Sequence, residues 1–277
     1  MPLHIGSARL GIFASAALSL TSAALASDPP VPAAEATASP AAVAPAQAPA
    51  ELARLVAAVD AAWPTRDEPG KLDAIQADLK NALELAPNDY GVLWRTARFY
   101  YWLADAPDIS DAEKARLGKL AWDYGDRATV ASPGSVEGWF YASTGVGMYS
   151  IGISIIKALL DGMEGKYLDR LKKAQSIDPS YYGYGAEVAW GRYYYELPWP
   201  KYDAEKSEEA LRKALKLYPK NLRAKVFLAE LYIKEDQAKA GIKLLEDVLA
   251  ATPGAYDAPE ERRVQSMARK VLAKAKS

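Results

Sequence analysis

Five prolines recur at the same point of a repeated pattern, and this recurrence constrains the fold more than any other feature of the sequence. Ala82, Ala128, Ala174 and Ala214 each stand five residues before one of these prolines. Apolar residues or glycines stand eight and two residues before each proline, so the three positions share one face of a helix. A small alanine lets a neighbouring helix approach closely, and a proline just beyond the helix end forces the chain to turn. The five prolines are Pro87, Pro133, Pro179, Pro219 and Pro253.

The spacing of these prolines predicts repeated helical hairpins. Successive prolines are 46, 46, 40 and 34 residues apart, and the last interval equals the period of the tetratricopeptide repeat (TPR). The best-formed stretch, Lys206 to Pro253, has the pattern helix, turn, helix, turn, helix. We therefore predict an all-α fold, a TPR-like array of helical hairpins with additional packed helices that can enclose a cavity or pore.

The N-terminus has the features of a secretory signal peptide. Arg9 supplies a short positive region, residues 10–20 form an apolar run, and Ala24-Leu25-Ala26 precedes Ser27. A membrane anchor needs about 20 continuous apolar residues, and serines interrupt this run. We predict cleavage after Ala26, an Ala/Pro-rich tether over 27–50, and one helical-repeat domain over 51–277 that ends in a capping helix.

Composition excludes several kinds of chemistry. The chain has no cysteine and one histidine, His4, which the predicted cleavage removes. Disulfides, thiolate nucleophiles, cysteine-based zinc sites and lipoprotein acylation are therefore excluded, and we expect no metal and no cofactor. The 34 basic and 35 acidic residues create no strong field for nucleic acid or for a membrane. An exported protein without disulfides fits the periplasm, where its own core holds the repeats together.

Amphipathic patterns and caps place the helices between the turns. Asn88-Asp89 and Ser110 are predicted N-caps, and Ser110 forms a capping box with Glu113. The last helix is basic and suits a solvating cap on the open end of the array. The predicted helices cover residues 51–62, 71–86, 90–105, 110 to the turn at 132–134, 138–160, 166–177, 181–197, 203–218, 222–234, 238–251 and 258–276.

Residues 138–160 are the most hydrophobic part of the mature chain. Glycines, serines and Lys157 interrupt the run, which makes it unsuitable as a membrane span. The prediction is a buried helix that packs closely through Gly145, Gly147 and Gly152, and a mature chain without a transmembrane helix. These glycines do not match a GxGxxG phosphate loop, so nucleotide binding is not expected.

A family resemblance comes from two adjoining stretches. Gly191-Arg-Tyr-Tyr-Tyr-Glu-Leu-Pro198 is followed by the repeat residues Ser207, Leu211, Ala214, Pro219, Asn221, Ala224, Leu228, Ala229, Glu230 and Tyr232. In these residues the chain resembles the TatT-type periplasmic components associated with tripartite ATP-independent periplasmic (TRAP) transporters, firmly over 168–272 and more weakly over 94–156. It is similar, more weakly, to eukaryotic regulators of microtubule dynamics.

The resemblance implies helical hairpins that surround a pore or cavity, association with a periplasmic solute-binding receptor, and no enzymatic activity. The chain departs from the family in two places. It lacks the lipoprotein cysteine, and it has WPKYDA where the family has a Gly-rich link after Leu-Pro. The first departure bears on tethering to the membrane, and the second on the mouth of the pore.

Clustered aromatic residues suggest a ligand site between helices. Their rings carry hydrogen-bonding tips and suit an apolar or ring-bearing solute. The alternative is that the rings fill the core of degenerate repeats. Arginines among the rings either pair with a carboxylate such as Glu187 or Glu196, or contact an anionic solute. The candidate ligand-binding residues are Trp94, Arg98, Trp139, Tyr141, Trp190, Arg192, Tyr194 and Trp199.

Catalysis and peptide binding are further alternatives. Glu187 and Glu196 lie about 13 Å apart along one helix, too far for a retaining glycosidase pair, and we predict that the chain is not an enzyme. TPR arrays also bind extended peptides in the groove of their first helices. The matching positions are Arg223, Val226, Glu230 and Ile233, although solvent exposure alone would explain the polar members.

Three hypotheses about function follow. The first is a non-enzymatic interaction component that assists solute capture or transfer for a periplasmic transporter, with a solute-binding receptor or another envelope protein as its partner. The second is a binding protein for an apolar small molecule. The third is a peptide-binding scaffold for envelope assembly. Nucleic acid is not an expected partner. The sequence allows a homo-oligomer and does not fix the oligomeric state.

Overall fold

The computed structural model describes residues 48–276. The predicted signal peptide and residues 27–47 of the predicted tether fall outside the described residues, and the last three tether positions already belong to the first helix. Residues 48–276 form helices and connecting turns and contain no β-strand. The all-α prediction is therefore confirmed.

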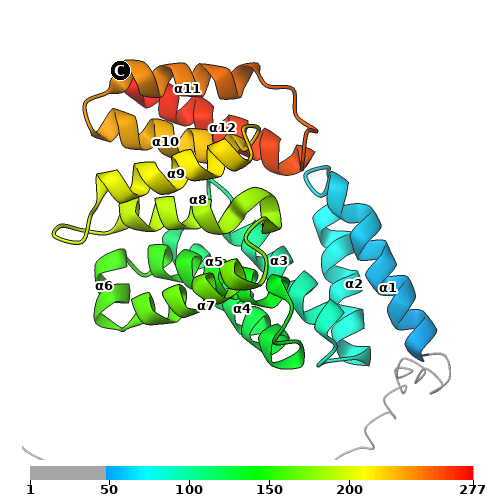
Figure 1. Ribbon diagram of the computed structural model, residues 1–277. Helices are drawn as coiled ribbons and strands as arrows, with labels where there is room; N and C mark the ends of the chain where they lie inside the picture. The colour runs from blue at the N-terminus through cyan, green and yellow to red at the C-terminus, as the bar shows by residue number, and fades with distance from the viewer. Residues whose placement is uncertain (1–47, 277) are drawn as a thin grey trace, which may run out of the picture. The chain divides into compact units, whose positions relative to one another are not determined.

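Five helical hairpins follow one another along the chain and stack side by side (Figure 1). α1 (Ala48–Ala62) pairs with α2 (Lys71–Leu85), α3 (Tyr90–Ala104) with α4 (Asp111–Ala131), and α5 (Val136–Gly152) with α7 (Met163–Ile177). α8 (Tyr181–Glu196) pairs with α9 (Ala204–Leu217), and α10 (Leu222–Lys234) with α11 (Ala238–Ala250). The short helices η1 (Trp63–Thr65) and α6 (Ile155–Leu160) lie in the turns of the first and third hairpins, and α12 (Ala258–Ala275) follows the last hairpin.

The second helix of each hairpin ends just before one of the five prolines. α2, α4, α7 and α9 end two residues before their prolines, and α11 ends three residues before Pro253. The alanines five residues before the first four prolines are at most 1% exposed, as close helix packing requires. The predicted N-caps also form, because Asp89 accepts the backbone N–H of Val92 and Ser110 accepts that of Glu113.

Glycines bring α4 and α5 unusually close together. A methyl group on Gly145 would lie 2.4 Å from the backbone nitrogen of Trp122, and one on Gly152 would lie 2.4 Å from that of Ala115. Gly145 and Gly152 are seven residues apart, so both lie on the same face of α5. The predicted close packing through these two glycines is confirmed. The predicted burial holds for much of α5 but is wrong for the end of the segment, where Ile156 is 62% exposed and Leu160 is 83% exposed.

The hydrophobic segment 138–160 differs from its prediction in two further details. Gly147 faces the ring of Tyr167 and not a neighbouring backbone. The single predicted helix is divided into α5 and α6, because Ser154 has a φ of 82° and interrupts the helix. No helix among residues 48–276 is both long and apolar enough to cross a membrane.

The start of α8 departs from regular helix. Tyr182, Gly183 and Tyr184 have φ values of 54°, 61° and 63°, a left-handed turn that the continuous helix prediction over 181–197 did not contain. Tertiary contacts hold this turn: the Gly183 carbonyl accepts the side-chain amide of Asn221 at 2.8 Å, and the Tyr182 ring packs on Phe140 at 5.5 Å between centroids. The turn aims Tyr182 at the cavity described below.

α12 does not act only as a solvating cap on the open end of the array. It packs on α10 and α11, and its first residues lie beside η1 in the first hairpin (Figure 1). Arg66 donates to Asp257 at 2.7 Å, and Arg263 donates to the Trp102 carbonyl at 2.6 Å. The prediction of a terminal cap is thus corrected: the last helix reaches back to the first two hairpins, through partners more than 150 residues away in sequence.

Alternating arginines and tryptophans join these distant elements. The Arg98 guanidinium lies 3.9 Å from the Trp63 ring and 4.7 Å from the Trp94 ring. Arg66 lies 4.5 Å from Trp63 and 4.0 Å from Trp102, and Arg263 lies 3.2 Å from Trp102. We call this set the Arg–Trp stack; its members are Trp94, Arg98, Trp63, Arg66, Trp102 and Arg263. Cation–π attraction and ring burial together tie η1, α3 and α12 to one another.

Candidate functional site

A cavity of about 420 Å³ lies between the hairpins and α12. α3, α5, α8, α10 and α12 all contribute to its wall, so no single repeat could form it. The wall is mainly aromatic and aliphatic, and this composition suits a small-molecule site. Its apolar members include Tyr101, Phe140, Met148, Tyr182, Val188 and Phe227.

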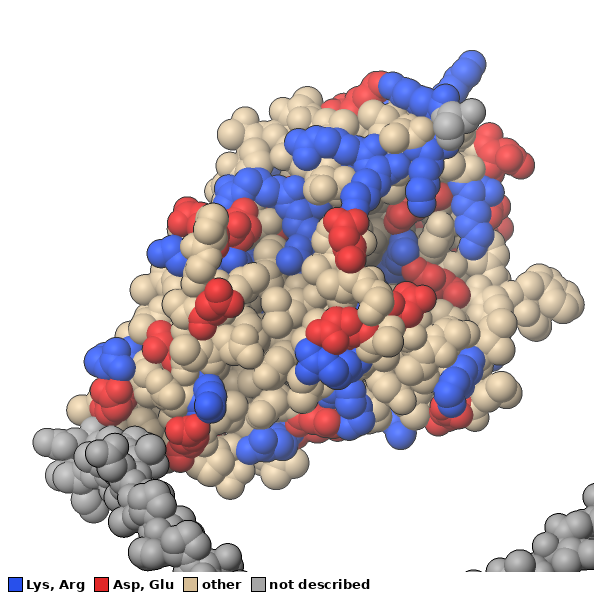
Figure 2. Space-filling view, turned by 180° about the vertical axis from the view of Figure 1, so that it is seen from behind, with Lys and Arg blue, Asp and Glu red and all other residues tan. Residues whose placement is uncertain are grey.

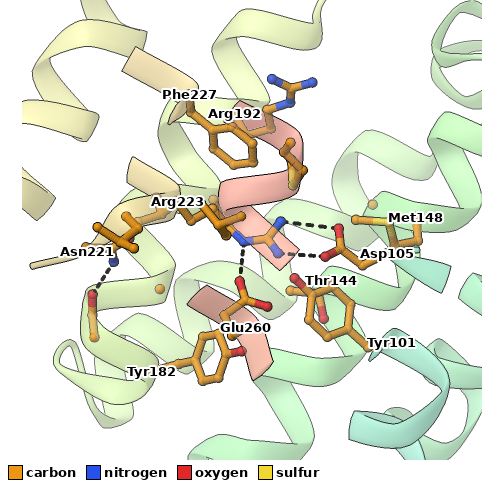
Figure 3. Close-up of a pocket in the computed structure, with 18 of the residues that line it drawn as sticks. Tyr101, Asp105, Thr144, Met148, Tyr182, Arg192, Asn221, Arg223, Phe227 and Glu260 are labelled. Atoms are coloured by element: carbon orange, nitrogen blue, oxygen red, sulfur yellow. Dashed lines mark hydrogen bonds and ion pairs between the residues drawn. The ribbon is translucent and has the colours of Figure 1, made fainter. Parts of the chain in front are cut away.

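Arg223 of α10 crosses one side of the cavity and binds two carboxylates (Figure 3). It donates to Asp105 at 2.6 Å and to Glu260 at 2.6 Å, and its side chain is 12% exposed. Burial opposes ionisation of Asp105, but the charge and hydrogen bond of Arg223, together with the charges of Arg263 and Lys114, lower the pKa of Asp105 below its usual value. Burial likewise opposes the charge on Arg223, while Asp105 and Glu260 raise its pKa well above the usual value.

A second arginine, Arg192 of α8, neutralises the adjacent part of the wall. It bonds to Glu230 at 2.6 Å and pairs with Glu196 at 2.5 Å. Its guanidinium also lies 4.6 Å from the Phe227 ring. Burial opposes its charge, yet the two carboxylates raise the pKa of Arg192. Arg192 and Arg223 therefore remain charged, and each is neutralised by two acidic partners.

The tyrosines of the cavity provide neutral polar groups. Burial raises the pKa of Tyr101 and of Tyr182, so both phenols keep their protons near neutral pH. Asn221 is already used, because its side chain caps α10 at Ala224 and donates to the Gly183 carbonyl (Figure 3). The interior thus offers apolar surface and hydroxyl groups, without an unpaired arginine or carboxylate.

The structure brings together three of the sequence-predicted site residues. Arg192, a ligand candidate, lies in the cavity wall with Arg223 and Glu230, which were candidates for a peptide groove. The predicted pairing of Arg192 with Glu196 is present, while Glu187 binds Lys213 and Gln175 instead of an arginine. The two candidate sets therefore meet in one place through Arg192 and Glu230.

Three ligand candidates lie outside the cavity wall, in the packing of α3 against α5. Trp94 stacks on Tyr141 with ring centroids 6.4 Å apart, and Tyr141 is 2% exposed. Arg98 belongs to the Arg–Trp stack, and its ion-pair contact to Asp60 is long, at 3.4 Å. Asp60 binds Arg95 more closely, at 2.5 Å. At these positions the rings fill the core, which was the alternative to a ligand site.

The remaining ligand candidates also lie elsewhere. Trp139 donates to the Pro133 carbonyl, and Trp190 donates to Gln175 and stacks on Tyr194 with centroids 6.0 Å apart. Trp199 is 88% exposed in the turn after α8. Trp139, Trp190 and Tyr194 do not line the cavity of about 420 Å³.

Three groove candidates are unavailable to an extended peptide. Val226 is 0% exposed, and Ile233 packs against the core cluster that joins α10, α11 and α12. Arg223 is occupied by Asp105 and Glu260. The return of α12 across the repeats therefore fills the place where a TPR array would hold a peptide.

Sequence reasoning missed Asp105 and Glu260 as site residues. Asp105 follows α3 and occupies its C-cap position. Its second role, as the acceptor for Arg223, depends on a partner 118 residues away, for which the local sequence holds no signal. Within residues 48–276, no group of three or more acidic, histidine or cysteine side chains is arranged to hold a metal ion.

Comparison with known proteins agrees with this architecture. A family model described as tetratricopeptide repeat matches residues 201–265. Among solved structures, TTC0263, a thermophilic TPR protein in Thermus thermophilus, is 20% identical with a TM-score of 0.57, over 82% of this chain and 99% of that chain. The chain has a TPR-like fold.

A second solved structure has a lower similarity to this TPR-like chain. A crystal structure of the MamA protein is 15% identical with a TM-score of 0.44, over 78% of this chain and 94% of that chain. No curated protein matches the sequence significantly. The family match covers α9, the fifth hairpin and the start of α12, and it contains the 34-residue interval from Pro219 to Pro253.

Proposed function

We propose that this TPR-like chain is a non-enzymatic binding protein of the periplasm that acts beside the solute-binding receptor of a TRAP-type transporter and assists solute capture or transfer. The cavity of about 420 Å³ is the observation that carries the proposal. Its wall is mainly apolar, its two arginines are each paired with carboxylates, and seven helices contribute to it, which are features of a compartment for a solute. The proposal also draws on the family resemblance in the sequence and on the signal-peptide pattern.

Affinity capture tests the association with a receptor. The mature chain from Ser27 onward, carrying a C-terminal tag, is incubated with a periplasmic extract of its source organism. We expect a solute-binding receptor to be retained and to bind again as a purified protein, with a 1:1 stoichiometry by analytical ultracentrifugation. An extract that contains solute receptors of this class, none of which binds the chain, would contradict the association.

Location is tested separately. The full-length chain is expressed in a bacterial host and the cell fractions are compared. We expect the protein in the periplasmic fraction with Ser27 as its first residue. Retention of residues 1–26, or recovery only in the cytoplasmic fraction, would contradict export.

The cavity also favours a second function, the binding of an apolar small molecule by this chain alone. An apolar compound that binds in the cavity of the folded protein stabilises it, by an amount that grows with the logarithm of the ligand concentration above the dissociation constant. At 100 times its dissociation constant, it adds about 2.7 kcal/mol to the free energy of unfolding. Thermal denaturation with a series of linear and ring-bearing solutes measures this effect, and a series without any shift would contradict it. The peptide-scaffold hypothesis has no comparable support, because α12 and its partners fill the predicted groove.

A further inference from the structure

Lysines gather where the cavity meets solvent. Lys114, Lys220, Lys270 and Lys274 all line the cavity of about 420 Å³. Lys220, Lys270 and Lys274 are exposed, and Lys114 is half-buried. We call these four residues the lysine rim. They come from α4, from the turn before α10 and from α12, so tertiary structure alone brings them together.

The carboxylates of the cavity wall are already engaged with other groups. Two of them bind Arg223 and two bind Arg192, as described above. The fifth, Glu261, accepts the backbone N–H groups of Gly254, Ala255 and Tyr256. All five carboxylates of the wall are therefore already engaged, four with the two arginines and one with backbone N–H groups.

Three of the rim lysines are only weakly engaged. Lys114 donates to the Ala104 carbonyl at 3.0 Å, which is a neutral acceptor. Lys270 pairs with Asp108, whose side chain is 79% exposed, and such surface pairs contribute little free energy. Among the described residues, no carboxylate pairs with Lys220 within 4 Å. An anion that meets these three lysines would thus not have to displace a buried ion pair.

The surface around the lysine rim also carries an excess of positive charge. Residues 201–277 contain 17 lysines and arginines against 12 aspartates and glutamates. Figure 2 shows Lys and Arg gathered over the upper part of the molecule, where α9–α12 lie. The near-zero net charge of the whole chain hides this local excess, which attracts anions towards the cavity mouth.

We propose that the cavity binds an amphiphile with an anionic head group: its apolar body lies among Tyr101, Phe140 and Val188, and its carboxylate or phosphate meets the lysine rim. The head stays at the mouth because both arginines of the interior are fully paired. This inference rests on the proposed small-molecule function and adds the charge and orientation of the ligand.

Matched ten-carbon probes test the inference. Decanoate, decyl phosphate and decanol share a chain length and differ in head group. Binding to the mature protein is measured by isothermal titration calorimetry below the micelle concentration, at low and at moderate salt. We expect both anionic probes to bind about tenfold more tightly than decanol, since charge-assisted hydrogen bonds to lysine are stronger than neutral ones. The difference in affinity between the anionic probes and decanol should decrease as the salt concentration rises. A comparison of decanoate with decyl phosphate shows which of the two head groups the protein prefers.

Two triple variants identify the lysines responsible. Lys220→Gln/Lys270→Gln/Lys274→Gln should reduce the affinity for the anionic probes to that for decanol and leave decanol binding unchanged. Lys216→Gln/Lys239→Gln/Lys243→Gln removes three other exposed lysines of the same region that do not line the cavity, and it should retain full affinity. Thermal denaturation without ligand checks that both variants are folded.

The outcomes separate this inference from the function on which it rests. If decanol binds as tightly as the anionic probes, or if both triple variants behave alike, the anionic inference is wrong while small-molecule binding stands. If none of the three probes binds, both are wrong.

Discussion

Arg223 shows how one residue can have a role that its local sequence conceals. By repeat position it belongs to the face of a first helix that a TPR array offers to a peptide. In the structure it is buried and holds Asp105 after α3 and Glu260 at the start of α12. A buried guanidinium with two carboxylates contributes mainly by not leaving any of the three charges unpaired. The side chain is therefore a link between distant elements as well as part of the cavity wall.

Asp105→Asn should destabilise the protein by about 3–5 kcal/mol at neutral pH, because it breaks a buried ion pair. The pKa of Asp105 is lowered in the folded state, so its stabilising contribution is present above its unfolded-state pKa of about 3.9 and is lost as pH falls through the lower folded value. The difference between wild type and variant in urea unfolding should stay constant from pH 7 to about pH 5 and shrink below about pH 4.

Asp108→Asn is the matched control, since its carboxylate is 79% exposed and pairs only with Lys270 at the surface. It should change the free energy of unfolding by less than about 1 kcal/mol. Equal changes in the free energy of unfolding for the two substitutions would show that the ion pair between Arg223 and Asp105 does not stabilise the fold.

At the scale of helices, small residues set the distance between the axes of packed helices. The alanines five residues before the first four prolines are buried, and Gly145 and Gly152 bring α5 against the α4 backbone. Such contacts leave no room for one additional methyl group. The aromatic residues around them fill the wider spaces between hairpins, so small and large residues have complementary roles in a degenerate array.

Gly145→Ala should lower the free energy of unfolding by about 1–3 kcal/mol, because its methyl group would meet the Trp122 backbone and force α4 and α5 apart. Gly165→Ala is the control. Gly165 also lies within a helix, α7, and no atom stands within 4 Å of the added methyl group. It should stabilise the protein by about 0.5–1 kcal/mol through helix propensity. Chemical denaturation at constant m-value measures the free energy of unfolding of both variants. Loss of stability in the Gly165 variant alone would contradict the steric explanation for Gly145.

For the described part of the molecule, the decisive feature is that the last helix meets the first hairpins. α12 covers the repeats, completes the cavity wall and contacts η1 and α3 through the Arg–Trp stack. A simple repeat array has contacts only between neighbouring repeats. This chain adds contacts between its two ends, so opening at either end should weaken the other.

Arg66→Met should therefore reduce the protection of α12 amides in hydrogen exchange, although Arg66 is in the first hairpin. The substitution leaves Asp257, the N-cap of α12, without its cationic partner and removes two ring contacts, with an expected loss of about 3–5 kcal/mol. Arg262→Gln breaks a more exposed pair with Asp67 and should cost less than about 1 kcal/mol. Unchanged protection of α12 in the Arg66 variant would contradict coupling between the two ends.

The sequence by itself determined the hairpins, their turns and their close contacts. Proline, alanine, glycine and cap residues act within one helix or between neighbours, so their effects can be read from short spacings. The sequence also pointed to Arg192, Arg223 and Glu230 as polar residues of interest. The arrangement of a site around them was not readable from those spacings.

Only the tertiary structure decided where α12 lies, and with it the cavity and the lysine rim. The partners of Arg66 and Arg223 are 191 and 118 residues away, and no periodic pattern records such pairings. The same holds for the aromatic residues, because a ring on a helix surface can fill a core or line a cavity with equal hydrophobic gain. Which of the two occurs depends on the element packed opposite, and here that element is the last helix of the chain.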